Sequence, residues 1–113
     1  VENRRRQRIG RFLDAVQLEK DGDRDFSVVA AMRFPGLTTR QDDANHRVLF
    51  STQGGCPGAI PIYLDDIYLG DDTDVVRTWD IAVAEFYSGP QVPVRYRTRD
   101  YGCGVLLLWS KWN

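Results

Sequence analysis

The feature that most constrains this chain is an unbroken apolar run near its C-terminus, VLLLW at residues 105–109. In a strand, successive side chains point to opposite faces of the sheet, so such a run needs cover on both faces. The run is far too short for a membrane helix, which takes roughly 20 apolar residues. We therefore predict a strand at the centre of a sheet, with other elements packed on each side.

A chain of 113 residues has room for one domain with a modest core. Its net charge is −1, so no overall field directs it to nucleic acid or to a membrane surface. Five arginines nevertheless crowd the N-terminus: Arg4, Arg5, Arg6, Arg8 and Arg11. We predict a basic N-terminal arm at residues 1–8 and a domain at residues 9–113. The arm is either a solvated tail or a docking element for an acidic protein surface or anionic lipid headgroups.

The first half of the chain predicts short elements of both kinds. Residues 9–18 fit either a strand followed by a turn or a short amphipathic piece, and the pattern does not choose between them. Residues 27–34 predict a helix that Asp25 or Ser27 caps and that Pro35 and Gly36 end. A short strand before a polar turn at 42–45, and a second strand at 47–53, follow it.

The second half opens with a tight hairpin, in which apolar residues 62–64 and 67–69 flank the turn Asp65-Asp66. Residues 70–81 predict a short helix with Asp72 or Thr73 as its cap. Residues 82–89 and 104–111 predict two more strands, the first of which runs into a Gly89-Pro90 turn. Helices and strands interspersed in this way indicate an α+β fold, a small mixed sheet with two short helices.

The two cysteines, Cys56 and Cys103, each lie beside glycines at a predicted strand edge. They either form one disulfide or are two buried thiols, because the spacing of a zinc site is absent. A bridge would close a long loop, stabilise the fold by about 4 kcal/mol in the chain-entropy account, and indicate an oxidising compartment.

Four of these segments, in order, resemble the plug domain of TonB-dependent outer-membrane receptors. The likeness is greatest to the short, cysteine-containing variants found beside carboxypeptidase-regulatory-like modules. VVAAMRFPGL is similar to the family's helix with its Pro-Gly-hydrophobic end, and PIYLDDIYL to its hairpin. DIAVAEFYSGP is similar to its strand and Gly-Pro turn, and GCGVLLLWSK to its closing strand. The resemblance covers about residues 9–112, and it lies in the order and spacing of the four segments, since no single one is specific.

The sequence also departs from the family pattern. Asp66 stands where the family usually has glycine, Glu85-Phe86 where it has Glu-Val, and no TonB box is recognisable in the first eleven residues. No barrel sequence follows the last plug-like strand. The resemblance therefore implies the fold and a place in the bacterial envelope, and we do not expect transport. Since the chain begins with Val1, we expect an upstream segment, either a signal peptide or another domain.

The polar residues form no recognisable catalytic or metal-binding pattern. His46 is either an exposed loop residue or a metal ligand, and the acidic residues at 71–74 either cap a helix or hold Ca²⁺ without EF-hand spacing. Asp65 and Asp66 could pair as acid and base, but adjacent side chains on a hairpin turn point apart. We expect no enzyme activity, no cofactor and no bound metal.

An Arg/Tyr-rich stretch precedes the last strand. Its composition is typical of protein interfaces, and with the basic arm it is the predicted partner-binding surface. The residues concerned are Tyr87, Arg95, Tyr96, Arg97, Arg99 and Tyr101, and Trp109 and Trp112 could extend it. The alternative is that the aromatic residues are packing residues of the core.

We therefore expect a non-enzymatic periplasmic domain that contacts other proteins, as an accessory or scaffolding subunit of a larger membrane complex. A photosynthetic or respiratory assembly would be a suitable host. The first alternative is a plug fragment of a TonB-dependent transport receptor in the outer membrane. The second, weaker alternative is a domain that binds a small ligand such as a siderophore.

Overall fold

The computed structural model describes residues 11–41, 47–52, 59–70, 73, 76–97 and 101–111. Its first half contains β1 (Arg11–Leu13), α2 (Ala15–Lys20), α3 (Phe26–Arg33), β2 (Leu37–Gln41) and β3 (Arg47–Ser51). Its second half contains β4 (Ile62–Leu64), β5 (Ile67–Gly70), β6 (Ile81–Tyr87) and β7 (Val105–Ser110). Four short 3-10 helices connect the later strands: η1 (Thr78–Asp80), η2 (Gly89–Gln91), η3 (Val94–Tyr96) and η4 (Tyr101–Cys103).

The apolar run at 105–109 forms most of β7, the middle strand of a five-stranded sheet with the order β1-β6-β7-β4-β5. β7 is antiparallel to β6 and parallel to β4, so the sheet is mixed. A second sheet consists of β2 and β3. The predicted α+β fold and the central place of the last strand are confirmed.

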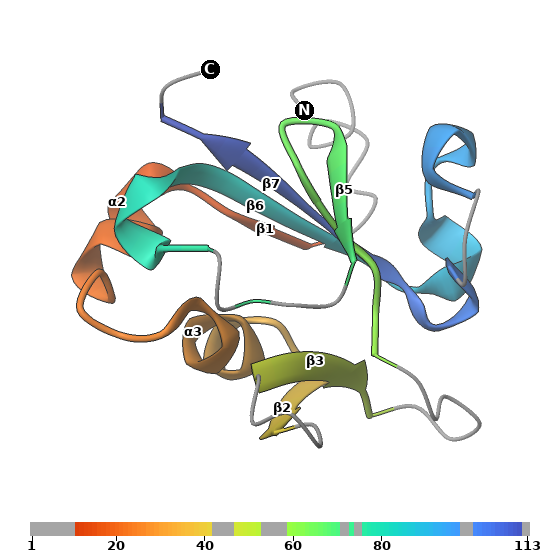
Figure 1. Cartoon of the computed structure of the whole chain (residues 1–113), viewed down its shortest axis with the longest axis horizontal. Helices are drawn as coiled ribbons and strands as arrows, with labels where there is room; N and C mark the ends of the chain where they lie inside the picture. Colours follow the sequence, from red (N-terminus) through yellow and green to blue (C-terminus); the bar gives the residue numbers. More distant parts are fainter. Residues whose placement is uncertain are drawn as a thin grey trace.

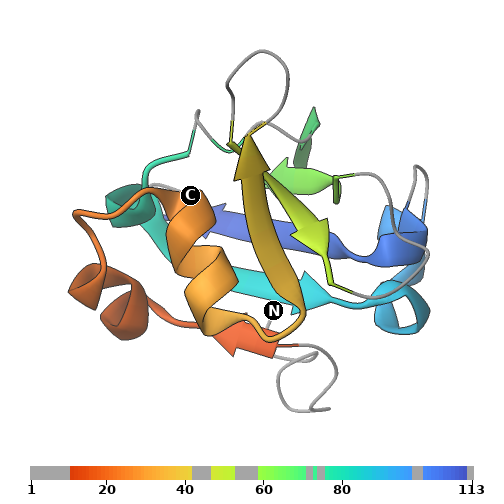
Figure 2. The same ribbon diagram turned by 90° about the horizontal axis from the view of Figure 1, so that it is seen from below.

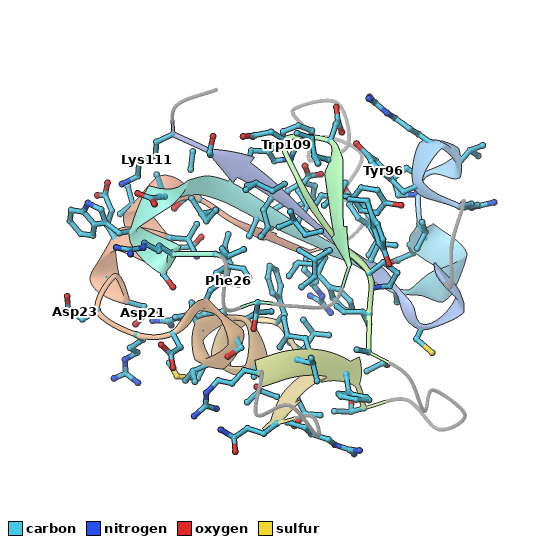
Figure 3. All side chains as sticks on the ribbon, in the orientation of Figure 1. Asp21, Asp23, Phe26, Tyr96, Trp109 and Lys111 are labelled. Atoms are coloured by element: carbon cyan, nitrogen blue, oxygen red, sulfur yellow. The ribbon has the colours of Figure 1, made fainter. Side chains whose placement is uncertain are left out.

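One face of the five-stranded sheet is covered by α3 and by the β2–β3 pair, which lie side by side across it (Figures 1 and 2). Phe26 and Phe34, at the two ends of α3, are buried in this layer. Figure 3 shows Phe26 between the helix and the sheet. The ring of Phe34 lies 5.9 Å from that of Phe86 on β6. Leu106 and Leu108 of β7 belong to the same cluster.

The opposite face of the sheet, below called the second face, carries a separate cluster to which the segment connecting β6 to β7 contributes from one end of the strands (Figures 1 and 2). Val92 and Tyr96 from this segment pack against Tyr63, Tyr87 and two residues of β7, Val105 and Leu107. Alternate residues of β7 therefore enter two different clusters. This arrangement is the physical reason why the strand is apolar at successive positions.

Residues 9–18, which the sequence left open, contain both a strand and a helix. α2 begins at a capping box, because Gln17 N–H donates to Asp14 and Asp14 N–H donates to the Gln17 side chain, both at 3.0 Å. α3 begins after Asp25, one of the two predicted caps, although the Asp25 side chain makes no capping hydrogen bond. It ends before Pro35 and Gly36, as predicted, and Gly36 has a φ of 97°.

The helix predicted over residues 70–81 is wrong for the part of this stretch that the structure describes. Only the short 3-10 helix η1 occurs there. Thr73 Oγ1 donates to the carbonyl of Arg47 at 2.7 Å, and Thr78 Oγ1 donates to the carbonyl of Arg24 at 2.9 Å. These side chain–backbone bonds attach the stretch to β3 and to the loop before α3, and they compete with helical hydrogen bonds.

The hairpin is confirmed, with Asp65 and Asp66 at φ values of 50° and 70° between β4 and β5. Two-residue turns of this kind need a left-handed backbone at both positions. Among the described residues, no helix is long and apolar enough to cross a membrane.

Candidate protein-contact surface

The stretch that the sequence predicts as partner-binding starts with residues 88–97, here called the contact segment. It leaves β6 through η2 and continues into η3. At η2 the backbone of Gly89 lies against Gly102 of η4, so close that a Cβ on Gly89 would be 2.2 Å from the Gly102 carbonyl oxygen. The two 3-10 turns therefore pack backbone to backbone, which only a glycine at position 89 allows.

Asp66 of the hairpin turn holds the contact segment in place. Tyr96 Oη donates to its Oδ1 at 2.5 Å, and Arg95 Nη2 donates to its Oδ2 at 2.8 Å. Tyr96 is only 3% exposed, and its ring lies 5.1 Å from that of Tyr63 on β4. The segment thus has a buried anchor and a charge-assisted hydrogen bond to a different part of the chain.

Asp65, the other turn residue, points to a different partner. Its Oδ1 accepts from Ser110 N–H at 2.9 Å and its Oδ2 accepts from Ser110 Oγ at 2.7 Å. The two carboxylates therefore bind separate elements, the end of β7 and the contact segment. This geometry agrees with the expectation that the pair points apart, and it leaves neither carboxylate arranged against the other as an acid–base pair.

The outer side of the contact segment carries exposed side chains. Val94 is 77% exposed and the Arg95 side chain is 68% exposed. Arg97 is also exposed, and its Nε donates to the Val92 carbonyl at 2.7 Å. The segment therefore exposes one apolar and two cationic side chains, while its contacts with Asp66 hold its backbone in place.

Two of the three tyrosines predicted to share this surface are buried. Tyr87 is fully buried and Tyr96 nearly so, and both belong to the cluster on the second face of the sheet. For these two residues the packing alternative holds, because their rings are needed to cover β7 on that face. The predicted contact residues Arg4, Arg5, Arg6, Arg8 and Arg99, and the side chain of Tyr101, lie outside the described residues. Arg11 is exposed at the start of β1.

Glu85 of β6 is a buried carboxylate that the sequence patterns did not identify as a candidate functional residue. Glu85 is 0% exposed. Its Oε1 accepts from Tyr87 Oη at 2.5 Å and its Oε2 accepts from Trp109 Nε1. Figure 3 shows Trp109 on the side of the sheet away from α3. The available signal was a single glutamate in the otherwise apolar strand IAVAEFY, next to a strand predicted to be buried on both faces.

The cysteines are only partly described. Cys103 is half-buried in η4 and is not a free thiol. Cys56 lies outside the described residues. The Cys56–Cys103 bridge therefore stays a prediction.

Other charged groups serve the fold in the described parts of the chain. Asp21, which follows α2, is buried, and Arg33 at the end of α3 approaches it with two nitrogens at 2.9 Å (Asp21 is labelled in Figure 3). Lys111 Nζ lies 3.0 Å from Glu19 Oε1 and 4.8 Å from the centre of the Trp79 ring. No group of acidic, histidine or cysteine residues suited to a metal ion occurs among the described residues. His46 and three of the four residues at 71–74 lie outside them.

Neither the known protein-family models nor the curated protein sequences include one that matches this chain.

Proposed function

We propose that this chain is a non-catalytic domain that works through protein–protein contact, as an accessory or scaffolding subunit of a larger membrane-associated complex. The observation that carries the proposal is the contact segment. Tyr96 and Asp66 fix its backbone, while Val94 and Arg95 remain exposed on its outer side. An ordered segment pays little conformational entropy on binding, so exposed apolar and arginine side chains on it can contribute most of their interaction energy.

A periplasmic location is part of the proposal and is supported by the resemblance to plug domains. The elements that carry the resemblance occur in the expected order: α3 with its Pro-Gly end, the β4–β5 hairpin, β6 with its Gly-Pro turn, and β7. The predicted disulfide favours the same compartment. The order of elements also favours the second candidate, the plug of a TonB-dependent transport receptor in the outer membrane.

The test is co-purification from the native membrane after gentle solubilisation. We expect the tagged wild-type chain to bring down a defined set of subunits in constant proportion. Val94→Asp should abolish this, because it places a carboxylate in the centre of the proposed contact. The matched control is Val16→Asp on α2, since Val16 is exposed to a similar degree, 64%, on a different element.

Recovery of the wild-type chain only as a free monomer would refute the proposal. If Val94→Asp and Val16→Asp lose partners to the same degree, the contact segment is not the site at which partners bind. Sequencing the gene beyond the codon for Asn113 decides between the accessory subunit and the receptor plug. A long series of alternating strands of about ten residues would favour the receptor, whereas an early stop codon would favour the accessory subunit.

A further inference from the structure

Met32, the single methionine of the chain, lies near the end of α3 and is 49% exposed. Methionines usually fill gaps in cores, where the flexible thioether adapts to its neighbours. The Met32 sulfur instead accepts a hydrogen bond from Arg24 Nη1 at 3.5 Å. A thioether sulfur is a weak acceptor, so this bond uses little of the donor strength of the guanidinium group.

The fold fixes the position of Arg24 in the loop between α2 and α3 (Figure 1). Its N–H donates to the Asp21 carbonyl at 3.0 Å, and its carbonyl accepts from Thr78 Oγ1 at 2.9 Å. Its Nε lies 3.9 Å from Oδ1 of the buried Asp21, whose Oδ2 accepts from Arg33. Two guanidinium groups therefore share one carboxylate, and these three side chains carry a net positive charge beside Met32.

Oxidation of a methionine to its sulfoxide turns this weak acceptor into a strong one. The sulfur forms an S–O bond with one of its lone pairs while the O–O bond of hydrogen peroxide breaks. The thioether loses two electrons, and the peroxide leaves as water after its proton moves to the departing oxygen. The sulfoxide is polar, and its oxygen carries a partial negative charge that a guanidinium group can bind by a charge-assisted hydrogen bond.

We propose that Met32 is a modification site, at which a hydroperoxide forms a sulfoxide that Arg24 then holds. The thioether is accessible because Met32 is half exposed, and rotation of the flexible side chain turns the new oxygen toward the guanidinium group. The stronger bond ties the end of α3 to the loop before it. Oxidation at Met32 therefore stabilises the domain, whereas a sulfoxide in a core disrupts it. This inference does not depend on the proposed contact function.

The test treats the purified full chain with dilute hydrogen peroxide and measures the added oxygen by intact mass. Thermal unfolding followed by circular dichroism then compares each protein with its own oxidised form. The wild-type Tm should rise by about 2 °C on oxidation, the shift that a surface charge-assisted bond produces in a domain of this size. The Tm of Arg24→Ala should not rise. The matched control is Arg95→Ala, which removes another exposed arginine that pairs with an aspartate, and it should keep the rise.

Two substitutions of Met32 separate its effect from oxidation elsewhere. Met32→Leu should take up no oxygen and show no rise in Tm under the same treatment. Met32→Gln needs no oxidant, because its amide oxygen lies near the place of the sulfoxide oxygen. Its Tm should exceed that of Met32→Leu by about 2 °C, and this difference should vanish when both carry Arg24→Ala.

Four results would overturn the inference. A fall in the wild-type Tm on oxidation would show that the sulfoxide disrupts α3, and an equal change in wild type and Arg24→Ala would exclude Arg24 as its partner. A rise that Met32→Leu also shows would assign the effect to another residue. Failure of the chain to gain oxygen under conditions that oxidise free methionine would show that the sulfur is not accessible.

Discussion

The carboxylate of Glu85 should be one of the largest single contributors to the stability of this domain. It is fully buried, and two side-chain donors, Tyr87 Oη and Trp109 Nε1, point at its two oxygens. A buried hydrogen bond contributes about 0.5–1.5 kcal/mol net, and removal of one partner leaves the other unsatisfied at a cost of about 1–3 kcal/mol. We therefore expect Tyr87→Phe, which removes one hydroxyl from the fully buried Tyr87, to lower the free energy of unfolding by about 2 kcal/mol.

The sharper form of the prediction is a double-mutant cycle with Glu85→Met, a substitution that keeps the length of the side chain and removes its two acceptor oxygens. Alone it should cost about 3 kcal/mol, because the hydroxyl and the indole N–H both lose their carboxylate acceptor. In the Glu85→Met background, Tyr87→Phe should cost close to nothing, since the hydroxyl that it removes has already lost the carboxylate as its acceptor. The coupling free energy should then be about 2 kcal/mol.

Urea unfolding followed by circular dichroism measures all four proteins. For a domain of this size, a loss of about 2 kcal/mol should lower the midpoint by about 1 M urea and the Tm by about 8 °C. A coupling free energy within about 0.5 kcal/mol of zero would show that the two side chains act independently. The assignment of Glu85 as the acceptor that holds the second face of the sheet would then be wrong.

The remaining predictions concern the contact segment and its supports. Gly89→Ala should lower the free energy of unfolding by about 2 kcal/mol, because the added Cβ meets the Gly102 carbonyl. Gly102→Ala should change it by less than about 0.5 kcal/mol, because nothing lies within 4 Å of the added Cβ. Urea unfolding of the two variants compares them directly. Asp66→Gly should destabilise the fold by about 1 kcal/mol in the same assay, since the relief at a φ of 70° is smaller than the loss of the two bonds that anchor the segment; a stabilised variant would show that backbone strain dominates. Reduction should add two hydrogens to the intact mass if the Cys56–Cys103 bridge exists, and alkylation of two thiols without reduction would exclude it.

The sequence predicted those parts of the fold whose signals are local. The unbroken apolar run at 105–109 required two covered faces, and β7 has them. The pair Asp65-Asp66 between two apolar segments indicated a tight turn, and Pro35-Gly36 indicated the end of a helix. Each of these features is decided by neighbours in the chain, so a single sequence is enough to find it.

The predictions that failed or stayed open depend on contacts between distant residues. Thr73 and Thr78 are ordinary helix-start and helix-interior residues in the sequence, yet their hydroxyls bind carbonyls 26 and 54 residues away. Glu85 looks like an isolated glutamate until Trp109, 24 residues later, is placed beside it. No pattern of neighbouring residues could have predicted these partners.

Asp66 shows how the two kinds of information combine. Its left-handed backbone is a local requirement, and glycine would meet it at least as well. The carboxylate, however, binds Tyr96, 30 residues later, and Arg95, and through them it fixes the segment that contributes Val92 and Tyr96 to the cluster on the second face of the sheet. The departure from glycine at this position is therefore explained by what the side chain holds and not by the turn. The same contact explains why Tyr96, predicted as a partner-binding residue, is buried as an anchor while its neighbour Arg95 remains exposed.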